Sequence, residues 1–100
     1  MTHMLCRNKV ADFAKWKRGF DSHAAAHRTA GLKLVHLWRD VDDPNNVFFL
    51  VEVGSMRKAR AFISTPEAVE AGREFGVLHG EVHFIVERST KRAVKRGTKR

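Results

Sequence analysis

Two histidines, His23 and His27, lie four residues apart in a stretch whose bulky side chains recur at steps of three and four residues. Phe13, Trp16 and Phe20 precede them at this spacing, so all five side chains share one face of a predicted helix. A histidine in apolar surroundings can donate or accept a proton, and aromatic rings can stack on an apolar molecule. The pattern favours a ligand pocket with His23 and His27 as catalytic candidates and Trp16 and Phe20 as binding candidates.

The same histidine pair has two other interpretations. Both rings could be structural, packed in the core and hydrogen-bonded to the backbone or to a facing strand. Two histidines at i and i+4 can also chelate a divalent metal, but no nearby acidic residue completes a strong zinc motif. We expect no metal and no cofactor.

A second group of candidates lies on the segment Leu32–Asp40, which alternates like a strand. Counting in steps of two places His36 and Trp38 on the same side as Leu32 and Leu34. This mixture of apolar bulk and one titratable ring is typical of a pocket wall, and an ordinary core around Trp38 is the alternative. We include His36 among the catalytic candidates and Trp38 among the binding candidates.

Two further residues are binding candidates with simpler alternatives. Arg28 could hold an acidic group of a ligand, or it could be a solvated surface residue. His79 stands in the sequence GVLHGE, where a loop could bring it over the mouth of the pocket or where it could be a plain turn residue.

The elements that must position these residues follow from periodicity, capping residues and turn signals. Asp12, Ser55 and Thr65 are predicted N-caps, Pro66 follows Thr65 at a tolerated first helical position, and Gly31 is a natural helix end. The predicted order is strand, helix, strand, strand, helix, strand, with the second helix interrupted. The ranges are 4–9, 13–30, 32–40, 47–53, 56–75 and 81–87, and the sequence VDDPNN provides the turn of a hairpin. This is the ferredoxin-like β-α-β-β-α-β arrangement with a four-stranded antiparallel sheet, an α+β fold.

Composition limits the chain to one domain. It has 100 residues, 43% hydrophobic and 30% charged, and it contains no apolar run near the roughly 18 residues that cross a bilayer. Cys6 is the single cysteine and is predicted to be buried in a strand. The first ten residues, MTHMLCRNKV, have no apolar signal core. We expect a cytoplasmic protein that makes no membrane contact.

The formal net charge of +8 is concentrated at the end of the chain. Residues 1–87 carry 12 basic and 11 acidic residues, so the predicted domain is almost neutral. Residues 88–100 carry seven basic residues and no acid, and we expect a flexible tail there. The alternative is an arm that makes weak, sequence-independent contact with nucleic acid or another polyanion. The basic residues of this tail are Arg88, Lys91, Arg92, Lys95, Arg96, Lys99 and Arg100.

The second and third predicted strands carry apolar residues on both faces. Phe49 and Val51 alternate with Phe48 and Leu50, whereas the helices of a ferredoxin-like fold cover only one face of the sheet. An exposed apolar face of this kind marks an association surface. The sequence therefore predicts a homodimer in which two sheets pack face to face.

The segment DFAKWKRGFDSHAAAHRTAG, the strand with His36, Trp38 and Arg39, and the segment DDPNNVFFLVEVGSMRKARAFISTPE carry a family resemblance. Over residues 4–87 the chain resembles the dimeric α+β-barrel proteins related to antibiotic-biosynthesis monooxygenases. The resemblance implies two chains packed sheet to sheet, each with a small-molecule pocket between its sheet and its helices. It implies no single activity, because the superfamily includes cofactor-independent oxygenases, isomerases, haem-degrading enzymes and proteins without a known reaction.

Haem degradation fits the chain poorly. That branch of the superfamily has a triad of Asn, Trp and His with the Asn on the first strand, which Asn8 matches only loosely. The two tryptophans, Trp16 and Trp38, lie outside the second helical region, so the triad does not carry over. The main hypothesis is a homodimer that binds a small apolar or aromatic molecule between its first helix and its sheet, as a cofactor-independent monooxygenase or an isomerase. The alternative hypothesis is a non-catalytic protein whose basic tail contacts a polyanion.

Overall fold

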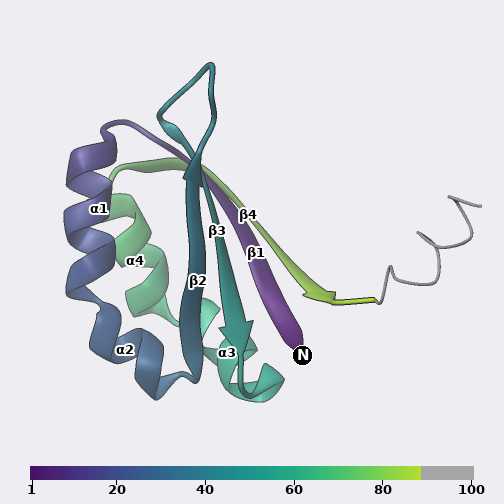
Figure 1. The fold of residues 1–100 in the computed structure, drawn as a ribbon. Coiled ribbons are helices and arrows are strands. Elements are labelled where there is room, and N and C mark those ends of the chain that lie inside the picture. The colour runs from purple at the N-terminus through teal and green to yellow at the C-terminus, as the bar shows by residue number, and fades with distance from the viewer. Residues whose placement is uncertain (89–100) are drawn as a thin grey trace, which may run out of the picture.

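The computed structural model of this chain describes residues 1–88 and confirms the ferredoxin-like order (Figure 1). The predicted basic tail lies outside the described residues except for Arg88. Each half of the fold has a strand, a pair of short helices and a second strand. The elements are β1 (Thr2–Val10), α1 (Phe13–Ser22), α2 (Ala24–Thr29), β2 (Leu32–Arg39), β3 (Asn46–Val53), α3 (Met56–Ile63), α4 (Pro66–Glu74) and β4 (Val77–Val86).

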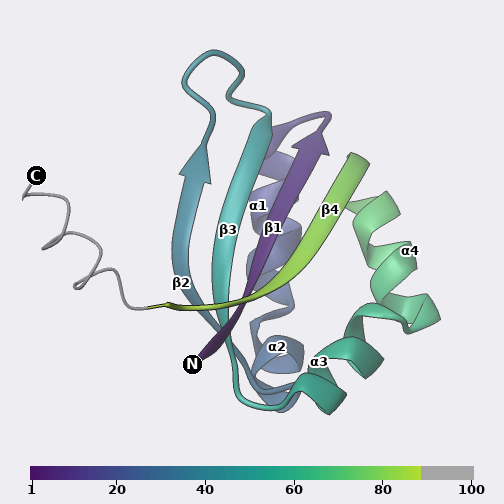
Figure 2. The same ribbon diagram turned by 90° about the vertical axis from the view of Figure 1, so that its right-hand side faces the viewer.

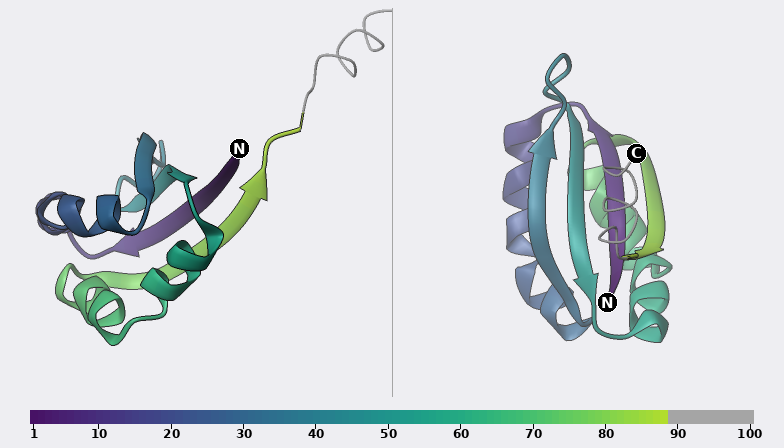
Figure 3. Two further views of the ribbon diagram at one scale, coloured as in Figure 1. Left: turned by 90° about the horizontal axis from the view of Figure 1, so that it is seen from below. Right: turned by 45° about the vertical axis from the view of Figure 1, so that its right-hand side comes forward.

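The four strands form one antiparallel sheet in the order β2-β3-β1-β4. Figures 2 and 3 show that the helices all lie on one face of this sheet and leave the other face open. None of the helices in residues 1–88 is long and apolar enough to span a membrane.

The helix ends follow the predicted capping chemistry. The Asp12 carboxylate accepts a hydrogen bond from the Ala14 amide, and the Ser55 and Thr65 hydroxyls accept bonds from amides of α3 and α4. Gly31 and Gly76 have φ values of 77° and 83°, the left-handed conformation that favours glycine at a helix end. These caps fix where each helix meets the sheet.

The first helical segment differs from the prediction of one continuous helix. It breaks at His23, which has φ −99° and ψ 15° and separates α1 from α2. The Ser22 hydroxyl donates to the Gly19 carbonyl at 2.6 Å, and the His23 amide donates to the Phe20 carbonyl at 3.2 Å. These bonds tighten the last turn of α1, so the helix is interrupted at His23 and α2 begins as a separate helix.

The core lies between the central strands and α1. Strand β3 alternates strictly, with Val47, Phe49 and Val51 buried toward the helices. Trp16 of α1 is 1% exposed and packs with its ring centroid 5.7 Å from that of Phe49. Burial of aromatic side chains of this size contributes on the order of 2–3 kcal/mol each, which makes this contact the main link between α1 and the sheet.

Strand β2 contains a bulge that the period-two count missed. Leu34 pairs with Val51 and His36 pairs with Leu50, so Val35 is an extra residue without a partner. The prediction that His36 and Trp38 share a face with Leu34 is therefore wrong. Both residues point to the open face, where their rings stack with centroids 4.9 Å apart.

Strand β4 also differs from the prediction. It begins at Val77 rather than at Glu81, and a register shift opposite Lys9 and Val10 accommodates Leu78. His79 is therefore a strand residue paired with Lys9 on the open face, and its prediction as a loop residue over the pocket mouth is wrong. The glycine at position 80 had suggested a loop, but here it allows close approach to Asn8, whose side-chain amide lies 3.0 Å from the position of an added Cβ.

The bulge makes a specific prediction about deletions in β2. Deletion of Val35 leaves Leu34 and His36 as ordinary neighbours on opposite faces, so we expect the free energy of unfolding to change by no more than about 1 kcal/mol. Deletion of Leu37 removes a core side chain and moves Trp38 to the helix face, so we expect a loss above about 2 kcal/mol. Urea denaturation of both variants measures the difference. Equal losses would contradict the bulge.

Candidate functional site

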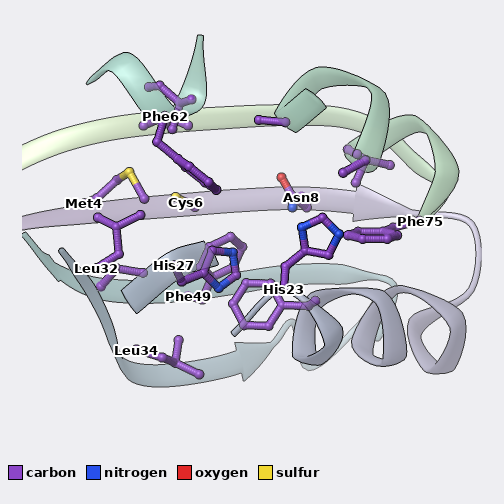
Figure 4. A pocket seen from close by; sticks show the side chains of 18 of the residues that line it. Met4, Cys6, Asn8, His23, His27, Leu32, Leu34, Phe49, Phe62 and Phe75 are labelled. Atoms are coloured by element: carbon purple, nitrogen blue, oxygen red, sulfur yellow. The ribbon is translucent and has the colours of Figure 1, made fainter. Parts of the chain in front are cut away.

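A cavity of about 260 Å³ lies between the centre of the sheet and the two helix pairs, α1 with α2 and α3 with α4. Its floor is formed by β1 and β3, one wall by α1 and α2, and the other wall by α3 and α4. Figure 4 shows side chains from these elements converging on this space. The lining is mostly apolar and aromatic, and it includes Met4, Cys6, Trp16, Phe20, Leu32, Leu34, Phe49, Val51, Phe62, Ile63, Phe75, Val77 and Val82, with Asn8, His23 and His27 as polar members.

Asn8 is the polar residue of the cavity floor. The inward positions of β1 are Met4, Cys6, Asn8 and Val10, so one amide interrupts an apolar row. With its amide oxygen toward α1, Asn8 accepts a hydrogen bond from Trp16 Nε1 at 3.3 Å and its amide nitrogen donates to the Arg7 carbonyl at 3.0 Å. One amide hydrogen and one lone pair then remain for a ligand.

His27 lies between aromatic rings of both helix pairs. Its ring centroid is 5.0 Å from that of Phe20 and 5.7 Å from that of Phe62 in α3. His23 meets Phe75 edge to face at 5.1 Å. Within residues 1–88 neither imidazole makes a side-chain hydrogen bond, so their ring nitrogens are available to a molecule in the cavity.

The surroundings of His27 favour its neutral form. Burial lowers the pKa of His27 below its usual 6.5, and the neighbouring His23 lowers it further by repelling a second positive charge. A neutral imidazole has one acceptor nitrogen, and here that nitrogen is next to apolar rings. His27 can therefore accept a proton or a hydrogen bond at neutral pH.

Phe75 closes one end of the space between the two helix pairs. Its ring packs on α1 at Gly19, where an added Cβ would lie 2.2 Å from Phe75 Cδ1. Only a residue without a side chain fits at this position. The contact fixes the distance between α1 and the end of α4, which sets the width of the cavity at His23.

Cys6 lines the cavity floor but is not a reactive thiol. Burial raises the pKa of Cys6 to about 12, so the thiolate is scarce at neutral pH. The structure thus confirms the predicted burial of this residue in a strand. In the part of the chain that the structure describes, no group of three or more His, Cys, Asp or Glu side chains is placed to hold a metal ion.

The cavity contains four of the eight predicted site residues, namely Trp16, Phe20, His23 and His27. Arg28 is exposed on α2 and does not line it, and His36, Trp38 and His79 point to the other face of the sheet. Sequence analysis missed Phe62 and Phe75 as lining residues. Glycine at position 19, on the aromatic side of α1, is the signal that could have indicated a large side chain docking there.

The geometry is that of a ferredoxin-like α+β protein with an apolar cavity between its sheet and its helices, and solved structures share this fold. A provisionally named antibiotic biosynthesis monooxygenase from Bordetella bronchiseptica matches with a TM-score of 0.72 and 15% identity, over 88% of this chain and 97% of that one. A protein from Caulobacter crescentus with the same provisional name matches with a TM-score of 0.67 and 17% identity, over 88% and 90%.

An uncharacterized NIPSNAP domain protein from Burkholderia xenovorans has the same fold, with a TM-score of 0.64 and 13% identity over 89% of this chain and 96% of that one. No protein-family model matches the chain, and the search of curated proteins finds no match. At these identities the likeness establishes the fold of antibiotic biosynthesis monooxygenase-like proteins, while activity must be argued from the cavity itself.

The lowered pKa of His27 predicts a pH dependence of stability. Between that pKa and 6.5 the unfolded chain binds more protons at this position than the folded chain, so the free energy of unfolding falls as the pH falls through this window. His27→Gln removes this contribution. We expect urea denaturation at a series of pH values to show a smaller loss of stability on acidification for the variant than for the wild type. Parallel curves for wild type and His27→Gln would contradict the assignment.

The contact between Gly19 and Phe75 predicts a coupling between the two positions. Gly19→Ala favours the helix by about 1 kcal/mol in isolation, but the methyl group must displace the Phe75 ring, and overpacking of this kind costs about 1–3 kcal/mol. We expect a net loss of stability that Phe75→Leu reduces in the double variant. A double-mutant cycle from denaturation midpoints measures the coupling, and additive effects would show that the ring does not pack on Gly19.

Proposed function

We propose that this protein binds a small, mostly apolar or aromatic molecule in the cavity between α1 and the sheet. The single observation that carries this proposal is the position of His27 between the rings of Phe20 and Phe62, where burial lowers its pKa. The lining contains no lysine, arginine or carboxylate. A charged ligand would therefore lose its hydration without gaining a partner, whereas a neutral ring system with one hydroxyl or carbonyl group finds matching donors and acceptors.

The chemistry that these residues support is removal of a proton from such a molecule. His27 accepts the proton, and Asn8 can donate a hydrogen bond to the oxygen on which negative charge develops. An isomerase returns the proton to another atom of the substrate. In a cofactor-independent monooxygenase the carbanion reacts with dioxygen, and the resulting peroxide takes back the proton from His27. The hydroperoxide then loses water and leaves a carbonyl group on the substrate, while the apolar cavity keeps other water from the reactive species.

We propose further that the protein is a homodimer formed through the open face of the sheet. At the centre of this face are Leu5, Phe48 and Leu50, flanked by Trp38 and Ile85, which are 46% and 40% exposed. The strands of this face bear three basic residues and two acidic ones, and a third acidic residue, Asp43 of the β2–β3 loop, pairs with Lys9. The fixed charges of the face therefore sum to zero, and two identical faces do not repel each other. A second copy of the chain therefore fits this surface, as the family resemblance implies.

Binding in the cavity can be followed with two built-in reporters. Trp16 Nε1 lies at the cavity floor, and Trp38 is on the opposite face of the sheet. We expect titration with 2-naphthol to shift the ¹⁵N–¹H signal of the Trp16 indole and to leave that of Trp38 in place. His27→Gln replaces the fixed imidazole nitrogen with a flexible amide at a different position, which weakens the hydrogen bond to the hydroxyl group, so we expect affinity to fall about 3- to 10-fold.

His36→Gln is the matched control for this experiment. It removes an imidazole from the open face, and we expect it to bind 2-naphthol as the wild type does. Equal shifts of both indole signals, or no shift of either at millimolar ligand, would contradict the cavity as the binding site. Equal affinity of wild type and His27→Gln would remove His27 from the binding role.

A further inference from the structure

The open face of the sheet carries four of the six histidines of the chain. His3 comes from β1, His36 from β2, and His79 and His83 from β4. The strand pairings place them across the whole width of the sheet, on the side away from the cavity. The other two histidines line the cavity, so the imidazoles of this protein fall into two separate environments.

The fixed charges on the open face cancel when these histidines are neutral. Three basic residues match three acidic ones on this surface. Asp43, at the base of the β2–β3 hairpin, pairs with Lys9, and Glu81 accepts a hydrogen bond from Arg7 at 2.9 Å. Protonation of all four histidines would therefore give each face a charge of +4. The bases are Arg7, Lys9 and Lys33, and the acids are Asp43, Glu52 and Glu81.

The acids present cannot neutralise the additional charges. Glu81 already pairs with Arg7, and the Nε2 atoms of His79 and His83 lie 3.9 Å and 3.7 Å from its oxygens. One carboxylate would then face three cations. In the single chain the side chains of His79 and His83 are more than 60% exposed to water.

The two remaining histidines of the open face have even less compensation. His3 is opposite Glu52 in the register, but Glu52 is also opposite Lys33 on the other neighbouring strand. His36 stacks on Trp38 and is opposite Leu50, in the apolar centre of the face. A proton on His36 would place a charge in the surface that a partner has to desolvate.

We infer that the open face is a pH-dependent self-association surface on which two copies pack when the four histidines are neutral and separate when they are protonated. The inference rests on the sheet-to-sheet dimer proposed above. Packing removes the imidazoles from water and brings together two identical faces, so the packed chain binds fewer protons than the single chain. By linkage, acidification then favours dissociation.

The experiment is sedimentation equilibrium of the full chain at about pH 8 and about pH 5.5 at one ionic strength, over concentrations up to about 100 µM. We expect a dimer at the higher pH and an increase of the dissociation constant of at least about tenfold at the lower pH. The combined variant His3→Gln, His36→Gln, His79→Gln, His83→Gln should have the same dissociation constant at both pH values. His23→Gln, changed on the cavity side, should keep the full pH dependence.

Each outcome separates the inference from the proposal beneath it. A wild-type dimer with equal dissociation constants at both pH values overturns the pH dependence and leaves the dimer. Single chains at both pH values overturn the dimer as well, while the binding of 2-naphthol in the cavity stands apart. Circular dichroism at both pH values shows that each variant is folded. If the combined variant does not fold, His36→Gln and His83→Gln are measured singly, and an unchanged pH dependence in both overturns the assignment to these histidines.

Discussion

The packing of Trp16 on Phe49 is the contact on which the rest of the structure depends. Trp16 is almost completely buried, stacks on Phe20 with ring centroids 4.8 Å apart, and donates a hydrogen bond to Asn8 of the central strand β1. It therefore fixes both the position and the rotation of α1 over the sheet. Since His23 follows Trp16 by two helical turns, this one ring determines where the histidines of the cavity point. The aromatic stripe is at once the attachment of the helix and the wall of the site.

The cavity exists because the two helix pairs, α1 with α2 and α3 with α4, contact the sheet on either side of its centre. Phe75 bridges them at one end by packing on Gly19, and the rings of His27 and Phe62 approach each other farther along. Apolar side chains line the remaining space, which raises the cost of burying any charge within it. The same low polarity lowers the pKa of His27 and raises that of Cys6. Burial, aided at His27 by the neighbouring His23, thus leaves an imidazole as the available base, and burial keeps the thiol protonated.

Sequence patterns predicted the fold because each local signal has a direct physical cause. Asp12, Ser55 and Thr65 cap helices as expected, since their side chains satisfy free backbone amides. The alternation of β3 also holds throughout. The error on β2 comes from Val35, an extra residue that a period-two count cannot detect, and the error on β4 comes from Gly80, which suggested a loop where the strand continues.

A single inserted residue reverses the face of every side chain beyond it. His36 and Trp38, predicted on the cavity side, therefore lie on the open face. The cavity residues Trp16 and Phe20 were predictable because no extra residue interrupts the helical period within α1. The alternation of side chains between the two faces gives consecutive residues of β3 different roles. Phe49 packs on Trp16 on the cavity side, and Phe48 belongs to the face proposed for the partner. A partner that packs on Phe48 would hold the backbone that positions Phe49. One strand would then form part of both surfaces, without any contact between the partner and the ligand.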